Sequence, residues 1–282
     1  MSDPKTVGGY KILRPLGSGL MGTVYLATQQ NQYWALRVVD EGRMRATGTV
    51  AKLVGDVLHP ALVRYKEIGA DPQVGGFITT DYVEARPVSR DGLAGLRASS
   101  RLGFITGLLE GLKVLHARGA IHGAIKTSNV LLRRRQQQID GLFIDAGFVY
   151  TTGPNRSGEL LRSAFPYMAP ELVQAYAGGD RNAIERTLSV GCDIYSAGLL
   201  VAEVLSGRTL FADAREPTEL VVRKRSTSVE VTGVNDPYVH LDLVALNQAL
   251  RSATASDPAQ RPASISAFID ALQLALPRVG KT

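Results

Sequence analysis

The spacing of apolar residues differs between the first part of the chain and the rest. Up to Val83, apolar positions form short runs that are rich in branched and aromatic side chains and are separated by glycine or by Gln and Asn. Runs bounded in this way are typical of strands. They predict strands at 10–17, 21–28, 33–39, 62–68 and 77–83, with one weak helix at 50–58.

Further along the chain the spacing becomes helical. From Leu102 to Leu115, apolar residues recur every three or four positions, which predicts a strong amphipathic helix. We expect Ser99 or Ser100 to cap its start and Gly119 to end it. The pattern also predicts helices at 188–206, 241–252 and 264–275, short strands at 130–132 and 142–144, and an irregular segment between 145 and 188.

A small β-rich part ahead of a larger helical part predicts an α+β, bilobal architecture. A cleft between two lobes is a common location for a ligand site. We assign residues 1–282 to a single domain, with an N-terminal lobe at 8–83 and a C-terminal lobe at 84–276.

Composition narrows the class of protein. Of the 282 residues, 45% are apolar and 21% are charged, which is typical of a globular chain and excludes disordered and fibrous classes. The net charge of +6 permits an acidic partner without requiring nucleic acid, and we expect no nucleic-acid partner. The single cysteine, Cys192, excludes a disulfide framework and fits a reducing, cytoplasmic location. The apolar stretch 188–205 contains Asp193 and Glu203, so we expect a buried helix and no membrane span.

A glycine-rich run lies between the first two predicted strands. Gly17, Gly19, Gly22 and Val24 form a G-x-G-x-x-G-x-V pattern, and residues of strand character follow it. Glycines let backbone N–H groups approach phosphate oxygens closely. The pattern favours a loop folded over a nucleotide between antiparallel strands, and an ordinary glycine-rich hairpin is the alternative.

Five further motifs follow in order. They are His122-Gly123-Ala124-Ile125-Lys126-Thr127-Ser128-Asn129, Asp145-Ala146-Gly147, Ala169-Pro170-Glu171, the segment that begins at Asp193, and Arg261-Pro262. The series resembles the eukaryotic-like protein kinase family, and its texture is similar to that of bacterial Ser/Thr kinases. The resemblance covers residues 10–276 and implies the bilobal protein-kinase-like fold.

The resemblance also implies a nucleotide site. Lys126 matches the lysine that reaches the γ-phosphate, and Asn129 and Asp145 match two magnesium ligands. The adenine slot and hinge of the family match Val24, Ala35, Leu131, Thr80 (a small gatekeeper), Asp81 and Val83. On this basis ATP and Mg²⁺ are the cofactors to test, and we expect their binding to be weak or absent.

Several positions depart from the family pattern. Arg37 stands where the family has a lysine, and Val50 stands where a glutamate pairs with that lysine. Ala124 replaces the aspartate that deprotonates the acceptor hydroxyl, so the general base is lost. Gly123 replaces the arginine that holds an activation-loop phosphate, and Ala146 replaces a phenylalanine.

Active kinases align a column of side chains between the lobes, and the matching positions are Tyr65, Val54, Ala146 and His122. One methyl group at Ala146 should not reach Val54. We therefore expect the helix before residue 59 to be displaced or loosely held, unless another side chain fills the gap.

The scaffold positions are kept: Glu171 and Arg261 match a buried ion pair, and Asp193 matches the acid that holds the catalytic-loop backbone. A preserved scaffold in which several side chains for phosphotransfer are missing is typical of a pseudokinase. The first hypothesis is therefore an inactive or very weak signalling module that regulates a partner protein, such as an active kinase. The alternatives are a residual Ser/Thr kinase or nucleotidyl transferase using Mg-ATP, and a scaffold whose cleft Arg37 blocks, or in which Arg37 pairs with Asp145.

Overall fold

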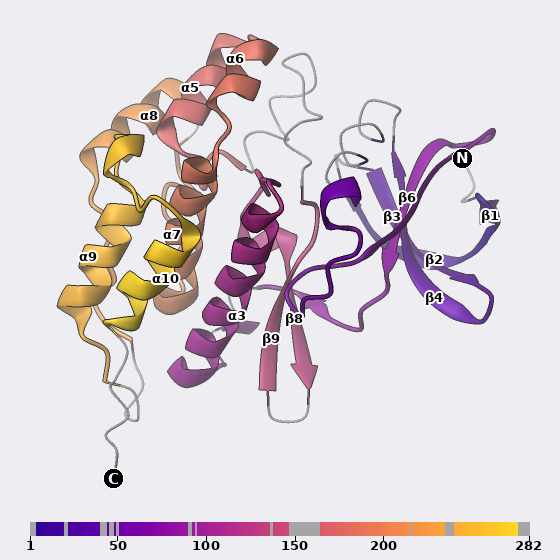
Figure 1. The fold of residues 1–282 in the computed structure, drawn as a ribbon, viewed down its shortest axis with the longest axis horizontal. Coiled ribbons are helices and arrows are strands. Elements are labelled where there is room, and N and C mark those ends of the chain that lie inside the picture. The colour runs from indigo at the N-terminus through magenta and orange to yellow at the C-terminus, as the bar shows by residue number, and fades with distance from the viewer. Residues whose placement is uncertain are drawn as a thin grey trace.

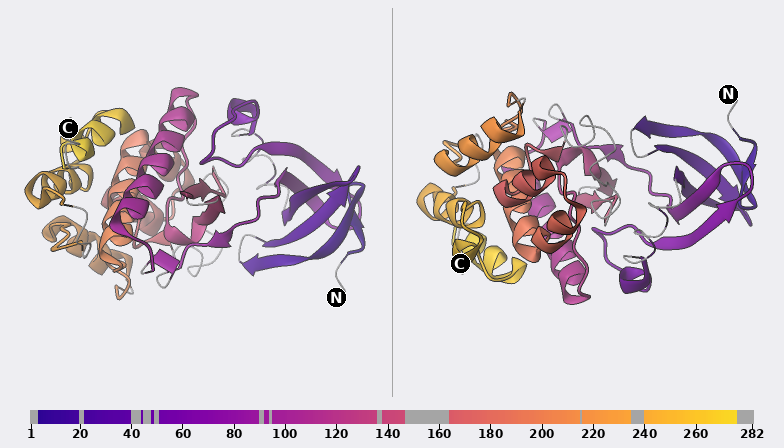
Figure 2. Two further views of the ribbon diagram at one scale, coloured as in Figure 1. Left: turned by 90° about the horizontal axis from the view of Figure 1, so that it is seen from below. Right: turned by 90° about the horizontal axis from the view of Figure 1, so that it is seen from above.

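The computed structural model describes residues 4–19, 22–39, 44, 48, 51–89, 92–93, 95–135, 138–146, 164–214, 216–234 and 240–275. A β-rich lobe lies at one end of the molecule and a helical lobe at the other, as Figures 1 and 2 show. The predicted α+β, bilobal architecture is confirmed.

The N-terminal lobe is one six-stranded antiparallel sheet with the strand order β1-β2-β3-β4-β6-β5. Tyr10, Trp34 and Phe77 are buried on one face of the sheet, and the ring of Tyr10 packs edge-on against the other two. Edge-to-face aromatic pairs stabilise such a core beyond the area they bury. The strands are β1 Thr6–Val7, β2 Tyr10–Gly19, β3 Gly22–Gln29, β4 Gln32–Val39, β5 Tyr65–Asp71 and β6 Gly75–Asp81.

One turn and one close approach of the backbone define how β3 pairs with β4. Gln30 and Asn31 both have positive φ, at 51° and 60°, as a two-residue hairpin turn of right-handed strand twist requires. Gly22 opens β3 at φ 98°, and a Cβ there would lie 2.3 Å from the carbonyl oxygen of Val38. Only glycine fits at this position.

The C-terminal lobe is built around α7, in which every residue from Cys192 to Leu205 is buried. The predicted buried helix is therefore confirmed. A small sheet of order β7-β8-β9 lies on the side of this lobe that faces the N-terminal lobe. The elements are β7 Arg86–Pro87, α3 Ala98–Ala117, β8 Val130–Arg135, β9 Gln138–Phe143, α5 Pro170–Gly178, α6 Arg181–Thr187, α7 Val190–Ser206, α8 Pro217–Ser226, α9 Leu243–Ala253 and α10 Ile265–Gln273.

The chain passes between the lobes at two places. Residues 82–85 lead from β6 to β7, which pairs with β8. The segment before β5 also contacts the C-terminal lobe, because the Phe143 N–H donates to the Ala61 carbonyl at 2.8 Å and Leu62 forms a bridge with Phe143. Strand β5 consequently begins at Tyr65 instead of the predicted Leu62.

Other differences concern helix ends and short elements. Ser99 and Ser100 lie inside α3 and do not cap it, so that prediction is wrong, whereas Gly119 follows the helix end at φ 71° as expected. The predicted irregular segment contains α5 and α6. Pro170 begins α5, and Gly179 ends it in a left-handed conformation. Of the predicted helix at 50–58, residues 51–54 are helical.

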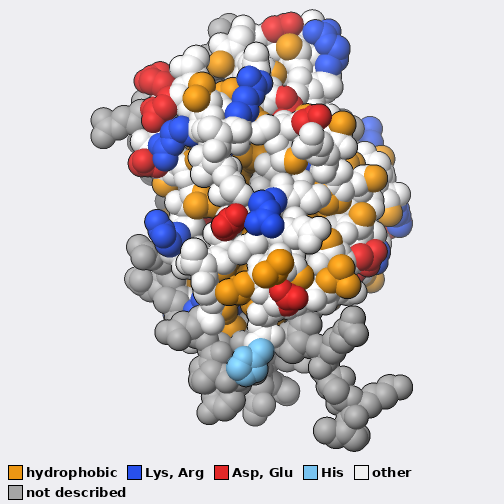
Figure 3. Space-filling model, turned by 90° about the vertical axis from the view of Figure 1, so that its left-hand side faces the viewer, with side chains coloured by type: hydrophobic (Ala, Val, Ile, Leu, Met, Phe, Trp, Pro, Cys, Tyr) orange, Lys and Arg blue, Asp and Glu red, His pale blue; other side chains and the backbone are white. Residues whose placement is uncertain are grey.

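Charged side chains of both signs are interspersed with apolar ones over the outer face of the helical lobe (Figure 3). Within the described residues, no helix combines the length and the apolar character that crossing a membrane requires.

Candidate functional site

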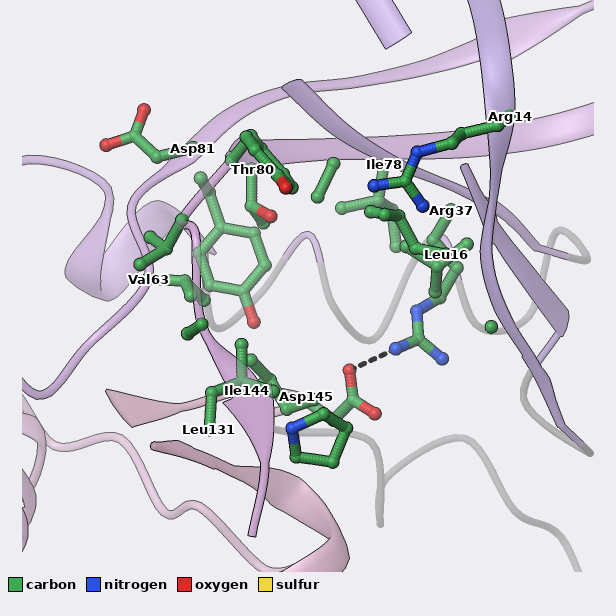
Figure 4. A pocket seen from close by; sticks show the side chains of 18 residues that line it. Arg14, Leu16, Arg37, Val63, Ile78, Thr80, Asp81, Leu131, Ile144 and Asp145 are labelled. Atoms are coloured by element: carbon green, nitrogen blue, oxygen red, sulfur yellow. Dashed lines mark hydrogen bonds and ion pairs between the residues drawn. The ribbon is translucent and has the colours of Figure 1, made fainter. Parts of the chain in front are cut away.

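A cavity of about 410 Å³ lies between the lobes. Figure 4 shows side chains of the N-terminal sheet on one side of it and residues of β8 and the end of β9 on the other. This volume is within the range of small-molecule sites. Of the predicted site residues, Gly17, Val24, Ala35, Arg37, Thr80, Asp81, Val83, Leu131 and Asp145 line the cavity. Gly22, Lys126 and Asn129 are not among the described residues that line it.

The alternation of side chains along β4 explains which residues reach the cavity. Trp34 and Leu36 are buried in the core of the sheet, so Ala35 and Arg37 point to the opposite face and into the cleft. Val24 is the cross-strand partner of Arg37 on β3. Leu131 approaches from β8 in the other lobe, and together these apolar side chains form a slot suited to a flat ring.

Sequence reasoning missed Arg14 and Leu16, which also line the cavity. Strand β2 has two register shifts, between Ile12 and Arg14 and between Pro15 and Gly17. Simple alternation fails across such irregularities, so the sequence pattern carried no signal for these residues.

The charged end of the cavity is organised by an ion pair between the lobes. One guanidinium nitrogen of Arg37 lies 2.5 Å from Oδ1 of Asp145, and the side chains are 14% and 15% exposed. Asp145 follows β9 with φ at 64°, a left-handed conformation that aspartate tolerates better than most residues. The alternative in which Arg37 pairs with Asp145 is therefore the arrangement observed.

Tyr65 bridges the lobes beside this pair. Its hydroxyl group donates to the carbonyl oxygen of Ala146 at 3.2 Å. Burial raises the pKa of Tyr65 well above its usual value, and the nearby carboxylate of Asp145 adds to the effect, so the hydroxyl stays protonated. Tyr65 thus reaches the residue beside which a gap was expected. We predicted that the helix before residue 59 is displaced. This stays a prediction, because residues 45–47 and 49–50, among them Val50, lie outside the described residues.

The loop that carries Ala124 is held by Asp193. The two carboxylate oxygens of Asp193 accept from the backbone N–H groups of His122 and Gly123, each at 2.8 Å, and His116 Nε2 lies 2.8 Å from Oδ2. Gly123 has φ at 69°. The expected role of Asp193 in holding this backbone is confirmed, and the methyl group of Ala124 stands on a rigid loop.

His122 is no substitute for the missing base. It is completely buried, and burial lowers the pKa of its imidazole, so the ring is neutral near pH 7. Its Nδ1 accepts a hydrogen bond from the Ala124 N–H at 3.3 Å, which places the remaining ring proton on Nε2.

Four carboxylates of this lobe have partners of their own. Asp140 lies 3.1 Å from Arg133, so it points elsewhere as expected. Asp145 pairs with Arg37 and Asp193 binds the loop backbone. Glu171 forms a two-point contact with Arg261, at 2.6 and 2.8 Å, which confirms the predicted scaffold ion pair.

Asp145, one of the two residues expected to hold Mg²⁺, does not fit that ion in this arrangement, because its Oδ1 contacts the guanidinium group of Arg37. The Asn129 side-chain nitrogen donates to the Ala124 carbonyl at 2.8 Å, which leaves the amide oxygen as the atom that could bind an ion. Across the part of the chain that the structure describes, no cluster of three or more His, Cys, Asp or Glu side chains could hold a metal ion. Lys126 lies near the pair, since Asp145 raises its pKa while burial, the larger effect, lowers it.

Comparison with known proteins places the chain in a family. Residues 10–270 match the protein kinase domain. The serine/threonine-protein kinase pkn2 of Myxococcus xanthus is 26% identical over 277 residues, which are 95% of this chain and 32% of that protein. An inactive leucine-rich repeat receptor-like serine/threonine-protein kinase of Arabidopsis thaliana is 33% identical over 181 residues, 61% of this chain and 27% of that protein. The chain thus spans about a third of the length of these relatives.

The fold comparison agrees with the sequence comparison. The crystal structure of the Mycobacterium tuberculosis PknI kinase domain superposes with a TM-score of 0.68 and 24% identity, over 96% of this chain and 97% of that one. The bilobal arrangement is therefore the protein kinase fold. The chain belongs to the protein kinase domain family.

Proposed function

We propose that this chain is a pseudokinase: a protein-kinase-like module, inactive or very weakly active, that binds nucleotide weakly and regulates a partner protein. The partner would be an active kinase or another signalling protein. The single cysteine of this chain, Cys192, is buried and reduced, which suits a cytoplasmic setting.

The observation that carries the proposal is the alanine on the loop held by Asp193. Protein kinases use an aspartate there to orient and accept the proton of the substrate hydroxyl. Ala124 has no group that can accept a proton, and a missing general base costs about 10²–10⁴ in rate. The Arg37–Asp145 ion pair supports the same conclusion, because it engages a carboxylate that phosphotransfer would use otherwise.

The proposal is tested by incubating the purified chain with Mg²⁺, ATP and a generic protein substrate. Intact mass spectrometry follows the chain and the substrate, and chromatography follows ATP. We expect unmodified proteins and intact ATP. Phosphate on either protein, lost in Asp145→Asn, would overturn the proposal.

A second candidate is a residual Ser/Thr kinase or a nucleotidyl transferase. The retained Lys126, Asn129 and Asp145 favour it, because positioning and electrostatics supply most of the catalysis of phosphoryl transfer. The same mass spectra distinguish the cases, since phosphate and adenylate adducts differ in mass.

A further inference from the structure

Positively charged side chains lie at the end of the cavity where Asp145 is found, which we call the phosphate end. Arg37 lies at Asp145, and the guanidinium groups of Arg14 and Arg37 lie on the same side of the cavity in Figure 4. Lys126 is also near Asp145. Arg37 and Lys126 thus lie close to this carboxylate, and Arg14 lines the same cavity. The other acidic lining residue, Asp81, lies 3.1 Å from Arg64, away from this group.

This distribution of charge opposes a divalent cation. An ion bound to Oδ1 of Asp145 would have to displace Arg37, and it would remain within a few ångströms of cationic side chains. Like charges at that distance repel strongly in a half-buried site. By the family resemblance, Val50 stands where a glutamate would pair with residue 37, and a valine side chain has no charge for such a pair.

An arginine can itself take the place of the ion toward a phosphate. Its guanidinium group is planar, stays charged, and matches the geometry of phosphate oxygens better than the ammonium group of a lysine does. Gly17 also lines the cavity, and a Cβ at Gly17 would meet no atom within 4 Å, so the backbone faces open space there.

Much of the remaining lining is apolar. Val24 and Ala35 approach from one lobe and Leu131 from the other, and residues 81–83 of the connecting segment also line the cavity. Such a slot suits a flat heterocyclic base, and the cationic end suits a chain of phosphates.

We infer that this cleft binds a nucleoside di- or triphosphate without a divalent cation, with Arg37 supplying the positive charge that Mg²⁺ supplies in other members of the family. The inference rests on the nucleotide-binding part of the proposed function and defines the chemical form of its ligand.

The test is calorimetric titration of the whole chain with ATP, in excess EDTA and in excess Mg²⁺. We expect Mg²⁺ to improve the dissociation constant by less than about threefold, or to weaken binding. An improvement of about threefold or more would overturn the inference, and so would the absence of ATP binding in both buffers.

Two variants test the assignment to Arg37. Arg37→Ala should weaken ATP binding in EDTA by about tenfold or more, and Mg²⁺ should then restore part of the affinity because Asp145 is released. Arg86→Ala is the matched control: it removes the same charge from an exposed position on β7 that does not line the cavity, and the ratio between the two buffers should not change. Equal behaviour of the two variants would contradict the role of Arg37.

A third variant, Asp145→Asn, guards against a failure of Arg37→Ala to fold. It removes a negative charge from the phosphate end, so ATP binding in EDTA should become tighter by about twofold or more. If the site needs the metal, Asp145→Asn would instead weaken ATP binding in excess Mg²⁺, and that result would overturn the inference. Phosphotransfer is measured separately: activity would overturn the proposed pseudokinase, whereas a Mg²⁺ requirement for binding would overturn only this inference.

Discussion

Arg37 reaches from β4 across the cleft to Asp145, so an ion pair connects the two lobes at the site. Both side chains are mostly buried, and neither is in a fully dry interior. The energetic weight of such a pair lies between that of a surface salt bridge and that of a buried one. Removing this pair should therefore lower the free energy of unfolding, without unfolding the protein.

We expect Arg37→Met to lower the free energy of unfolding by about 1–2 kcal/mol, because Asp145 loses its partner in a half-buried position. Urea denaturation measures the change. The double variant with Asp145→Asn should lose less than the sum of the two single changes, since both act on one contact. Additive losses would show that the pair carries no coupling energy.

At the scale of elements, α8 is attached to the segment before α5 by a buried lysine. Lys224 is 2% exposed, its Nζ donates to the Pro166 carbonyl at 2.7 Å, and it lies over the rings of Phe211 and Tyr195 at 4.5 and 5.0 Å. Burial lowers the pKa of Lys224 well below 10.5, and the carboxylate of Glu171 opposes this shift.

The pH dependence of stability tests this contact. Because the pKa of Lys224 is lower in the folded chain than in the unfolded chain, the unfolded chain binds the proton more tightly. Stability should therefore rise with pH between the lowered pKa and 10.5. Urea denaturation across this range should show the rise in the wild type and a smaller one in Lys224→Met. Identical pH profiles would contradict the assignment.

Elements that are bounded by clear turn residues or marked by regular apolar spacing were predictable from the sequence, whereas long-range contacts were not. Glycines and the Gln-Asn turn delimit β2, β3 and β4, and unbroken apolar spacing marks α3 and α7. Helices α5 and α6 are only 9 and 7 residues long, too short for a clear period. Arg37 and Asp145 are 108 residues apart, so the sequence could name their pairing only as one alternative.

At the scale of the whole molecule, the scaffold and the cleft differ in what they retain. Arg261 is completely buried as a side chain, contacts Glu171 at two points, and also donates to the Ala255 and Gly191 carbonyls at 2.8 and 3.1 Å. The scaffold thus keeps Arg261 and Glu171 paired, whereas in the catalytic loop Gly123 and Ala124 stand where the family resemblance places an arginine and an aspartate.

Glu171→Gln should destabilise the whole chain by about 3–5 kcal/mol, because the buried guanidinium group of Arg261 would lose its counter-charge. Thermal and urea unfolding followed by circular dichroism measure the loss. Arg223→Gln breaks the exposed contact with Asp213 and is the control, with an expected change below about 1 kcal/mol. Similar losses in both variants would contradict the structural role of the buried pair.

The most direct measurement is the initial rate of phosphate transfer from labelled ATP to a generic substrate, compared between the wild-type chain and Asp145→Asn at equal concentration. With no proton acceptor at Ala124, we predict that the two rates are indistinguishable and equal to the protein-free background. A wild-type rate above background that Asp145→Asn abolishes would contradict the account.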